Sequence, residues 1–201
     1  MASREPRRDS SRSPNSPELD DPSPEQLAIR CQNGCHDSFE HLVHQFESRI
    51  FNYLVKMMGN ASDAEDITQE AFLKAFRSIH RYDPSFPFAN WLFTIAKRTA
   101  ISFLRARRST EELPADLAVD SPNPADTSST AEDKMALWQQ AKRLKPKQYE
   151  ALWLRYGEGF SVAEVARIMQ INVVYVKVLL HRARGQLAKR LASRPQEFQH
   201  G

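Results

Sequence analysis

The chain has 201 residues and a formal net charge of +3, and it contains six glycines and twelve prolines. This length accommodates one or two domains with cores of their own. No run of eighteen apolar residues occurs and no apolar segment near the N-terminus resembles a signal peptide, so we expect a soluble cytoplasmic protein with no membrane partner. Long stretches of helical periodicity between proline-rich connectors predict an all-α fold.

Charge is distributed unevenly along the chain. Residues 109–133 carry seven acidic and no basic residues, whereas residues 134–201 carry thirteen basic and four acidic ones. The basic C-terminal part therefore predicts a contact with nucleic acid. Segments rich in Ser, Pro, Asp or Ala offer little to bury and are expected to be disordered. The predicted organisation is two small helical domains joined by a flexible acidic linker: a disordered tail 1–24, a domain 25–108, the linker 109–133, a domain 134–192 and a tail 193–201.

Helices are predicted in the first domain over residues 25–32, 37–58, 63–80 and 87–107. Gly59 and Asn60 end the second of these, and Ser62 opens the third. Ser62 and Glu65 have the spacing of a capping box, and the acids that follow Ser62 suit a first turn because unpaired amides and the helix dipole favour carboxylates there.

The third helix contains the stretch DAEDITQEAFLKAF, residues 63–76. Projection at 3.6 residues per turn predicts a core stripe of Ala64, Ile67, Ala71, Ala75 and Ile79. Another face carries Asp66, Gln69, Glu70, Leu73 and Arg77. A leucine among acids and an amide suggests a small docking surface for a basic partner, although a single exposed leucine also fits an ordinary solvated face.

Aromatic residues gather between the third and fourth helices, in RYDPSFPFANWLF, where Pro84 and Pro87 break the helix. These aromatics are Tyr82, Phe86, Phe88, Trp91 and Phe93. The following helix supplies the basic residues Lys97, Arg98, Arg105, Arg107 and Arg108. Aromatic faces beside cations suit single-stranded nucleic acid, which stacks its bases and needs its phosphates neutralised. The alternative is a loop folded onto the core, above all for Phe88, Trp91 and Phe93.

Helices are predicted in the second domain over residues 134–144, 146–156, 161–169 and 173–192, and the short gap between the last two is that of a helix-turn-helix. Ser161 and Glu164 form a second capping box, and Asn172 can cap the final helix.

The final helix is predicted to be amphipathic and basic. Its buried stripe is Val176, Leu180, Ala183, Leu187 and Leu191. The residues on or beside its outward side are Tyr175, Lys177, Val178, His181 and Arg182. These features favour a helix that reads DNA over the alternative of a solvated basic face.

The motifs of catalysis and metal binding are missing from this sequence. Cys31 and Cys35 in CQNGCH precede His36, but no second ligand pair follows elsewhere, so we expect two reduced thiols and no metal. No pairing of nucleophile and base, paired catalytic carboxylates or phosphate loop is recognisable. We therefore expect a protein that is not an enzyme and needs no cofactor.

Three segments in order resemble bacterial sigma factors of the extracytoplasmic-function (ECF) group. DAEDITQEAFLKAF is similar to their segment that binds core RNA polymerase. RYDPSFPFANWLFTIAKRTAISFLRARR resembles the segment that opens and reads the minus-ten promoter element. LKPKQYEALWLRYGEGFSVAEVARIMQINVVYVKVLLHRAR resembles the domain that reads the minus-thirty-five element. The resemblance covers about residues 25–108 and 134–192.

The resemblance implies partners and site residues. The partners are core RNA polymerase, through a coiled coil of its largest subunit, and promoter DNA, with an anti-sigma factor as a further candidate. The polymerase-binding residues would be Asp66, Gln69, Glu70 and Leu73. The minus-ten residues would be Tyr82, Phe86, Asn90, Trp91, Lys97, Arg98 and Arg105. The minus-thirty-five residues would be Ser161, Tyr175, Lys177, Val178, His181 and Arg182.

The sequence departs from the family pattern mainly where DNA is read. Arg98 stands where many members have Asn, and Phe86 stands where an Arg usually follows the serine of the loop. The family's TVKSRLHRAR is YVKVLLHRAR here, so Tyr175, Val178 and Leu179 replace a Thr, a Ser and an Arg. Tyr149 replaces the Arg of the LPxRQRE pattern, and Gln170 replaces the turn glycine. Loss of two hydrogen-bonding side chains predicts an upstream element richer in A·T than usual, read by apolar contact between Val178 and thymine methyl groups, while Leu179 is expected to pack inward. The alternative is that the helix register differs by one position and Val178 joins the core.

Two further hypotheses remain open beside a sigma factor that directs polymerase to promoters and helps to melt them. An ordinary helix-turn-helix regulator would need neither a polymerase-docking face nor a melting loop. A regulatory decoy would bind polymerase but, with its altered recognition helix, would scarcely bind DNA.

Overall fold

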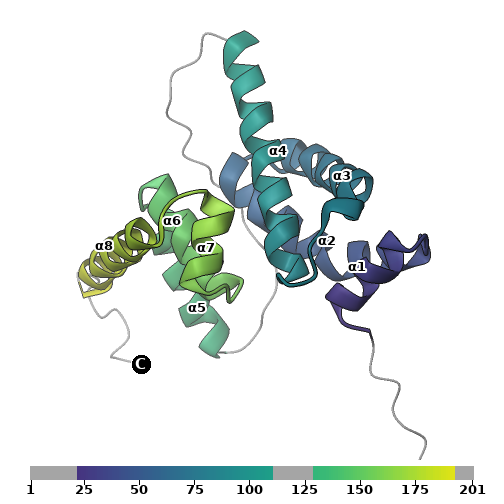
Figure 1. The fold of residues 1–201 in the computed structure, drawn as a ribbon. Coiled ribbons are helices and arrows are strands. Elements are labelled where there is room, and N and C mark those ends of the chain that lie inside the picture. The colour runs from purple at the N-terminus through teal and green to yellow at the C-terminus, as the bar shows by residue number, and fades with distance from the viewer. Residues whose placement is uncertain (1–21, 111–128, 193–201) are drawn as a thin grey trace, which may run out of the picture.

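The computed structural model describes residues 22–110 and 129–192, and all regular structure in these ranges is helical. The predicted N-terminal tail up to residue 21, the C-terminal tail and most of the predicted linker lie outside the described residues. The N-terminal half contains α1 (Pro24–Gln32), α2 (Asp37–Met58), α3 (Ala61–Ser78), a 3-10 turn (Ile79–Arg81) and α4 (Phe88–Thr110). The C-terminal half contains α5 (Ser129–Ala141), α6 (Pro146–Leu152), a π-helical turn (Trp153–Gly157), α7 (Val162–Met169) and α8 (Val173–Ala192) (Figure 1).

The predicted all-α fold is confirmed, with differences at the ends of elements. α5 begins at Ser129, so the prediction of a disordered linker is wrong for residues 129–133. The sequence of this turn explains the difference, because Ala is the best helix former and acids are favoured near a helix N-terminus. Thr110, also assigned to the linker, is the last residue of α4.

The start of α3 differs from the predicted capping box. Asn60 is the N-cap, and its side chain accepts a hydrogen bond of 3.0 Å from the Ser62 amide. The predicted box of Ser62 and Glu65 is therefore wrong, because the extended Asn60, directly after the left-handed Gly59 that ends α2, starts the helix two residues earlier. Of the acids placed in the first turn by sequence, Asp63 alone lies there.

The N-terminal half is built on α2, α3 and α4, which pack on one another with α1 at one end. The predicted core stripe of α3 is buried as expected: Ala64, Ile67, Ala71, Ala75 and Ile79. Phe88 and Phe93 of α4 are fully buried beside Phe46 and Tyr53 of α2. The alternative of a loop and helix start folded onto the core is therefore confirmed for Phe88 and Phe93.

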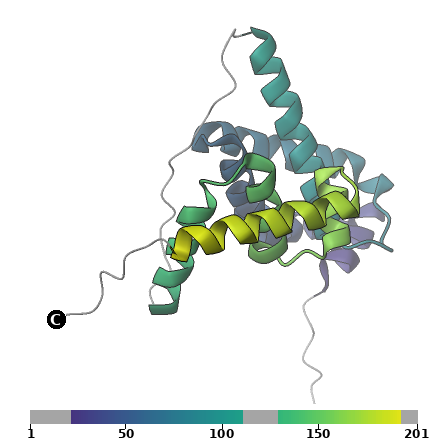
Figure 2. The same cartoon turned by 90° about the vertical axis from the view of Figure 1, so that its left-hand side faces the viewer.

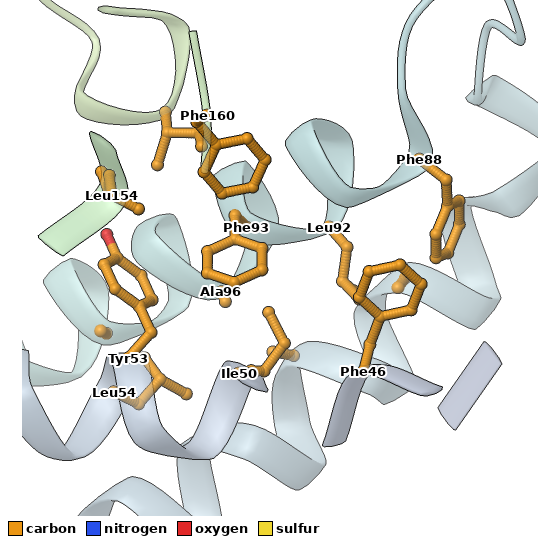
Figure 3. Packing of buried hydrophobic residues seen from close by; sticks show 14 of the residues in the cluster. Phe46, Ile50, Tyr53, Leu54, Phe88, Leu92, Phe93, Ala96, Leu154 and Phe160 are labelled. Carbon is orange, nitrogen blue, oxygen red and sulfur yellow. The ribbon is translucent and has the colours of Figure 1, made fainter. Parts of the chain in front are cut away.

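The two halves of the chain share one hydrophobic core. Leu154 and Phe160 of the C-terminal half pack with Tyr53 and Phe93 of the N-terminal half (Figure 3). The ring centroids of Phe93 and Phe160 lie 5.0 Å apart in an edge-to-face arrangement. A smaller second cluster lies within the C-terminal half, where Tyr149 packs against Trp138. In this structure the two halves are thus in contact through apolar side chains.

The helix-turn-helix is formed by α7 and α8, and Figure 2 shows α8 lying across the front of the C-terminal half. Val176, Leu180, Ala183 and Leu187 are buried as predicted. Leu191 is exposed, so its assignment to the buried stripe is wrong. The reason is that Leu191 lies in the last turn of α8, at the end of the helix.

Candidate functional site

The predicted polymerase-docking face of α3 is at the surface. Asp66 and Gln69 are exposed, Glu70 is half-exposed, and the Leu73 side chain is 49% exposed. The Glu70 carboxylate lies 3.2 Å from the Lys74 ammonium one turn later, an exposed pair of small energetic value. The structure therefore brings all four residues of this face together on one helix, with Leu73 available for contact.

Phe76 extends this face, and the sequence reasoning missed it. Its side chain is exposed although its ring contacts Phe39 at 5.0 Å and His36 at 5.5 Å. Phe76 lies three residues after Leu73, a spacing that puts both side chains on neighbouring positions of one helical face. That spacing was the signal in the sequence that could have found Phe76.

Tyr82, predicted to stack on DNA bases, is instead part of the core. Its side chain is 3% exposed, and its ring lies 5.4 Å from the rings of both Phe88 and Trp91. Its hydroxyl donates a hydrogen bond of 2.6 Å to the Phe86 carbonyl, and burial raises the pKa of Tyr82 to about 12. In this conformation Tyr82 cannot stack on a base, because its ring is almost completely enclosed by its neighbours.

The other members of the predicted minus-ten set are divided between surface and interior. The Phe86 ring is 42% exposed and lies 4.4 Å from the guanidinium of Arg167 in α7. Trp91 is half-buried. Asn90 is buried, and its side-chain amide donates a hydrogen bond of 3.1 Å to the backbone carbonyl of Glu164.

Lys97 lies at the contact between the two halves. Its side chain is 8% exposed, and its ammonium pairs with Glu150 Oε1 of α6 at 2.5 Å. The same oxygen accepts a hydrogen bond of 2.8 Å from the Tyr53 hydroxyl of α2. Burial and the neighbouring Glu150 carboxylate together hold the pKa of Tyr53 well above its usual value, so its hydroxyl remains a donor.

Arg98 and Arg105 are exposed on α4, as a role in binding phosphates requires. The C-terminal part of α4 projects beyond the other described helices in both views (Figures 1 and 2). Arg107 on this part pairs with Asp63 of α3 at 2.8 Å, which ties the projecting helix back to the start of α3.

The turn that positions the recognition helix is built as predicted, with one strained residue. Ser161 and Glu164 form the predicted capping box of α7, with hydrogen bonds of 2.7 and 3.2 Å. The Asn172 side chain accepts a hydrogen bond of 2.7 Å from the Tyr175 amide and caps α8. Gln170, which replaces the turn glycine of the family, has a φ of 55° in the left-handed region, where a side chain is unfavourable.

The outward side of α8 carries the predicted residues Tyr175, Lys177, His181 and Arg182, all of them exposed. Val178 is half-buried, whereas Leu179 is buried as expected from the helix register. The sequence reasoning missed two apolar residues at the start of this helix. Val173 is exposed and Val174 is 70% exposed, so the N-terminal end of α8 presents an apolar surface.

The two cysteines differ in environment. Cys31 is buried, which raises the pKa of its thiol. Cys35 is exposed, and a hydrogen bond of 3.2 Å from the Ser38 hydroxyl lowers the pKa of its thiol. No group of three or more His, Cys, Asp or Glu side chains in residues 22–107 and 135–192 is arranged to hold a metal ion. Within the part of the chain that the structure describes, no helix is long and apolar enough to cross a membrane.

The fold and these surfaces define a helical DNA-binding protein with a helix-turn-helix in its C-terminal half. The sequence profile of sigma-70 region 2 matches residues 42–110, and that of sigma-70 region 4 matches residues 134–187. The chain belongs to the ECF RNA polymerase sigma factors.

Relatives from several bacteria share this sequence pattern. The chain is 33% identical to the ECF sigma factor BldN of Streptomyces coelicolor over 83% of its own length and 65% of that protein's. It is 30% identical to the ECF sigma factor SigW of Bacillus subtilis over 80% of its own length and 92% of SigW. It is 31% identical to the RNA polymerase sigma-H factor of Pseudomonas aeruginosa over 83% of its own length and 93% of that factor. The chain thus spans slightly less than two thirds of BldN and nearly all of the other two.

Solved structures show the same fold at lower identity. CnrH, solved in complex with the cytosolic domain of CnrY, has a TM-score of 0.61 and 21% identity, and the match covers 85% of this chain and 98% of CnrH. RpoE of Bartonella quintana, solved in complex with the anti-sigma factor NepR, has a TM-score of 0.61 and 22% identity, and the match covers 78% of this chain and 98% of RpoE.

Proposed function

We propose that this chain binds core RNA polymerase, directs it to specific promoters and helps to melt them, acting in the cytoplasm as a subunit with no catalytic chemistry of its own. The observation that carries the proposal is that three exposed surfaces follow one another in the order of the family. They are the face of α3 around Leu73, the basic helix α4 with Phe86 before it, and the outward side of α8. This arrangement supports two domains in the sense of the family, 25–108 and 134–192.

The α3 face suits a basic helical partner such as the coiled coil of the largest polymerase subunit. Carboxylates at Asp66 and Glu70 would speed association and fix register, because complementary charge acts mainly on the rate and specificity of encounter. Leu73 and Phe76 add apolar area, which supplies affinity once the surface is dehydrated.

The α4 and α8 surfaces suit two different forms of DNA. Arg98 and Arg105 can neutralise phosphates, and the partly exposed Phe86 ring can stack on an unpaired base. Lys177, His181 and Arg182 can hold α8 against the backbone of duplex DNA, with Val178 toward the base edges. An anti-sigma factor stays a candidate partner because of the family resemblance.

Transcription reconstituted with purified core polymerase tests this function. Core polymerase with the chain should produce discrete transcript 5′ ends on fragmented genomic DNA, and core polymerase alone should not. Co-purification with core polymerase without any new 5′ end would favour the decoy. Binding to duplex DNA without association with polymerase would favour an ordinary helix-turn-helix regulator.

A further inference from the structure

The two cysteines of the chain lie in the turn between α1 and α2. Cys31 is in the last turn of α1, and Cys35 lies two residues before α2. Two hydrogen bonds close this turn: the Gly34 amide donates to the Cys31 carbonyl at 3.0 Å, and the Cys35 amide donates to the Arg30 carbonyl at 3.0 Å. Gly34 has a φ of 92°, the left-handed conformation that ends many helices. The chain thus reverses direction between the two cysteines.

Cys35 has the environment of a reactive thiol. It is exposed, and its sulfur accepts hydrogen bonds from the Ser38 hydroxyl, at 3.2 Å, and from the Ser38 amide. These donors belong to the first turn of α2, where free amides and the helix dipole favour an anion. They lower the pKa of the Cys35 thiol. More of this thiol is therefore present as the thiolate, the form that attacks oxidants, than of an ordinary cysteine.

Cys31 supplies a second thiol beside the first. It is buried at the end of α1 as part of the hydrophobic core. The charge of Cys35 contributes to the raised pKa of the Cys31 thiol, so the two sulfurs are close enough to interact. An exposed, acidic thiol next to a second thiol is the arrangement of redox-sensing cysteines. In the cytosol, where thiols are kept reduced, a disulfide between such cysteines is usually transient and regulatory.

The same turn supports the polymerase-docking face of α3. His36 directly follows the second cysteine, and its ring lies 5.5 Å from the ring of Phe76, which extends that face. Gln32 lies between the two cysteines, and its side-chain amide donates hydrogen bonds of 2.9 and 2.8 Å to the carbonyls of Ile79 and Tyr82, just after α3. A rearrangement of the turn therefore reaches the docking face and the end of α3.

We propose that Cys31 and Cys35 are a redox-active pair that peroxide converts into an intramolecular disulfide, and that the oxidised chain binds core polymerase more weakly. Because Cys31 is buried and Cys35 is exposed, bond formation moves at least one of the two sulfurs, and the turn moves with it. This movement displaces His36 from its place beside Phe76. The effect on polymerase rests on the proposed function, whereas the disulfide rests on the two thiols alone.

The oxidation balances with peroxide as the oxidant. The Cys35 thiolate attacks one peroxide oxygen, the O–O bond breaks, and a sulfenic acid forms on Cys35 while the departing hydroxide takes up the proton that the thiol released. The Cys31 sulfur then attacks the Cys35 sulfur, the S–O bond breaks, and the departing hydroxide takes the proton of the Cys31 thiol. The two thiols lose two electrons, and peroxide is reduced to two molecules of water. A dithiol reductant reverses the change by thiol–disulfide exchange.

Mass spectrometry of the full chain tests the disulfide without polymerase. The chain has two cysteines, and trypsin leaves both in one peptide, residues 31–49. After treatment with hydrogen peroxide this peptide should be lighter by two hydrogen atoms, and dithiothreitol should restore its mass. Cys31→Ala should instead accumulate a sulfenic acid on Cys35 that dimedone traps, because the second thiol is missing. Circular dichroism of each variant verifies that its helices are intact.

A hydroxyl variant tests the reactivity of Cys35. Ser38→Ala removes a hydrogen bond to the thiol and should slow the oxidation at neutral pH at least about twofold, because less of the thiol is ionised. Its matched control is Ser62→Ala at an exposed position of α3, which should oxidise at the rate of the parent. Equal rates in Ser38→Ala and the parent would overturn the assignment of Cys35 as the thiol that attacks peroxide.

The affinity of the chain for core polymerase tests the consequence of oxidation. The chain is treated with peroxide, and free peroxide is removed before core polymerase is added. The affinity of the oxidised chain should be at least about fivefold lower than that of the reduced chain, a loss of about 1 kcal/mol. The control is the double variant with Cys31→Ala and Cys35→Ser, whose affinity should not respond to peroxide. This control accounts for oxidation of methionines.

The outcomes separate the disulfide from its effect on polymerase. A peptide that keeps both thiols, a stable sulfenic acid on Cys35 of the parent or a disulfide between two chains would overturn the redox-active pair. A disulfide with unchanged affinity, or an equal loss of affinity in the double variant, would overturn its effect on docking. If the reduced chain does not bind core polymerase, that effect fails with the proposed function, and the mass of the peptide still decides on the pair. If Cys31→Ala fails to fold, Cys35→Ser at the exposed position serves as the control that cannot form the disulfide.

Discussion

Alanine substitution of two neighbouring aromatic residues should separate stability from promoter melting. Substitution of Tyr82 should mainly lower the stability of the fold, whereas substitution of Phe86 should mainly reduce promoter melting. Tyr82 is 3% exposed and packs against two aromatic rings, so Tyr82→Ala should lower the free energy of unfolding by about 3–5 kcal/mol. Phe86 is 42% exposed, and its contact with Arg167 is worth about 0.5–1 kcal/mol, so Phe86→Ala should cost about 1 kcal/mol or less.

Urea denaturation followed by circular dichroism measures both losses. Tyr82→Phe is the matched control, because it removes only the hydroxyl that donates to the Phe86 carbonyl and should cost about 0.5–1.5 kcal/mol. Permanganate reactivity of promoter thymines measures melting. Phe86→Ala should reduce melting while the protein stays folded, since stacking on an unpaired base is worth about 1–3 kcal/mol.

The melting defect of Tyr82→Ala should follow the loss of folded protein and diminish at lower temperature. If Tyr82→Ala unfolds at the same urea concentration as the parent, Tyr82 is not a core residue and the argument from its burial fails. If Phe86→Ala melts promoters as the parent does, the exposed ring does not stack on DNA.

Further predictions concern four other parts of the molecule. Substitution of both Asp66 and Glu70 by Lys should weaken binding to core polymerase at least about tenfold, or 1.4 kcal/mol, and lower the free energy of unfolding by about 0.5 kcal/mol. Undiminished co-elution of the variant with core polymerase would contradict this prediction. Gln170→Gly should raise the free energy of unfolding by about 1 kcal/mol in urea denaturation, because it relieves a left-handed residue; an unchanged midpoint would refute this. Because its pKa is lowered, Cys35 should be alkylated by iodoacetamide with a pH midpoint below that of the same thiol in the urea-unfolded chain, and coincident midpoints would be inconsistent with the hydrogen bond to the thiol. Replacing thymines of the upstream element by uracil removes the methyl groups and should weaken DNA binding of the parent by less than a bidentate contact is worth, which is about 1–3 kcal/mol. The same replacement should leave DNA binding of the Val178→Ser variant unaffected. Equal losses of affinity in both proteins would place Val178 away from the bases.

The sequence by itself determined the features that depend on residues close together in the chain, namely helix periodicity and helix caps. The stripe of Ala64, Ala71 and Ala75 recurs at helical spacing, and burial of one helical face follows from that periodicity. The capping box at Ser161 and the cap at Asn172 were predictable because each closes a hydrogen bond over three residues. The sequence did not determine which residue caps α3, since Asn60 and Ser62 are both good N-cap residues. In the structure the N-cap is Asn60.

The tertiary structure decided which site residues are accessible. The sequence predicted Lys97 and Asn90 as DNA-binding residues at the surface, but both are buried in the structure. Lys97 pairs with Glu150, 53 positions away in the chain, and Asn90 donates to the backbone of Glu164, 74 positions away. The sequence predicted Tyr82 as an aromatic residue of an exposed loop, but in the structure its ring packs against Phe88 and Trp91. Periodicity reports which face of a helix is apolar, but it carries no information on which distant segment covers a polar one. The contact between the halves depends on shape and on charges paired across space, and these exist only once the chain has folded.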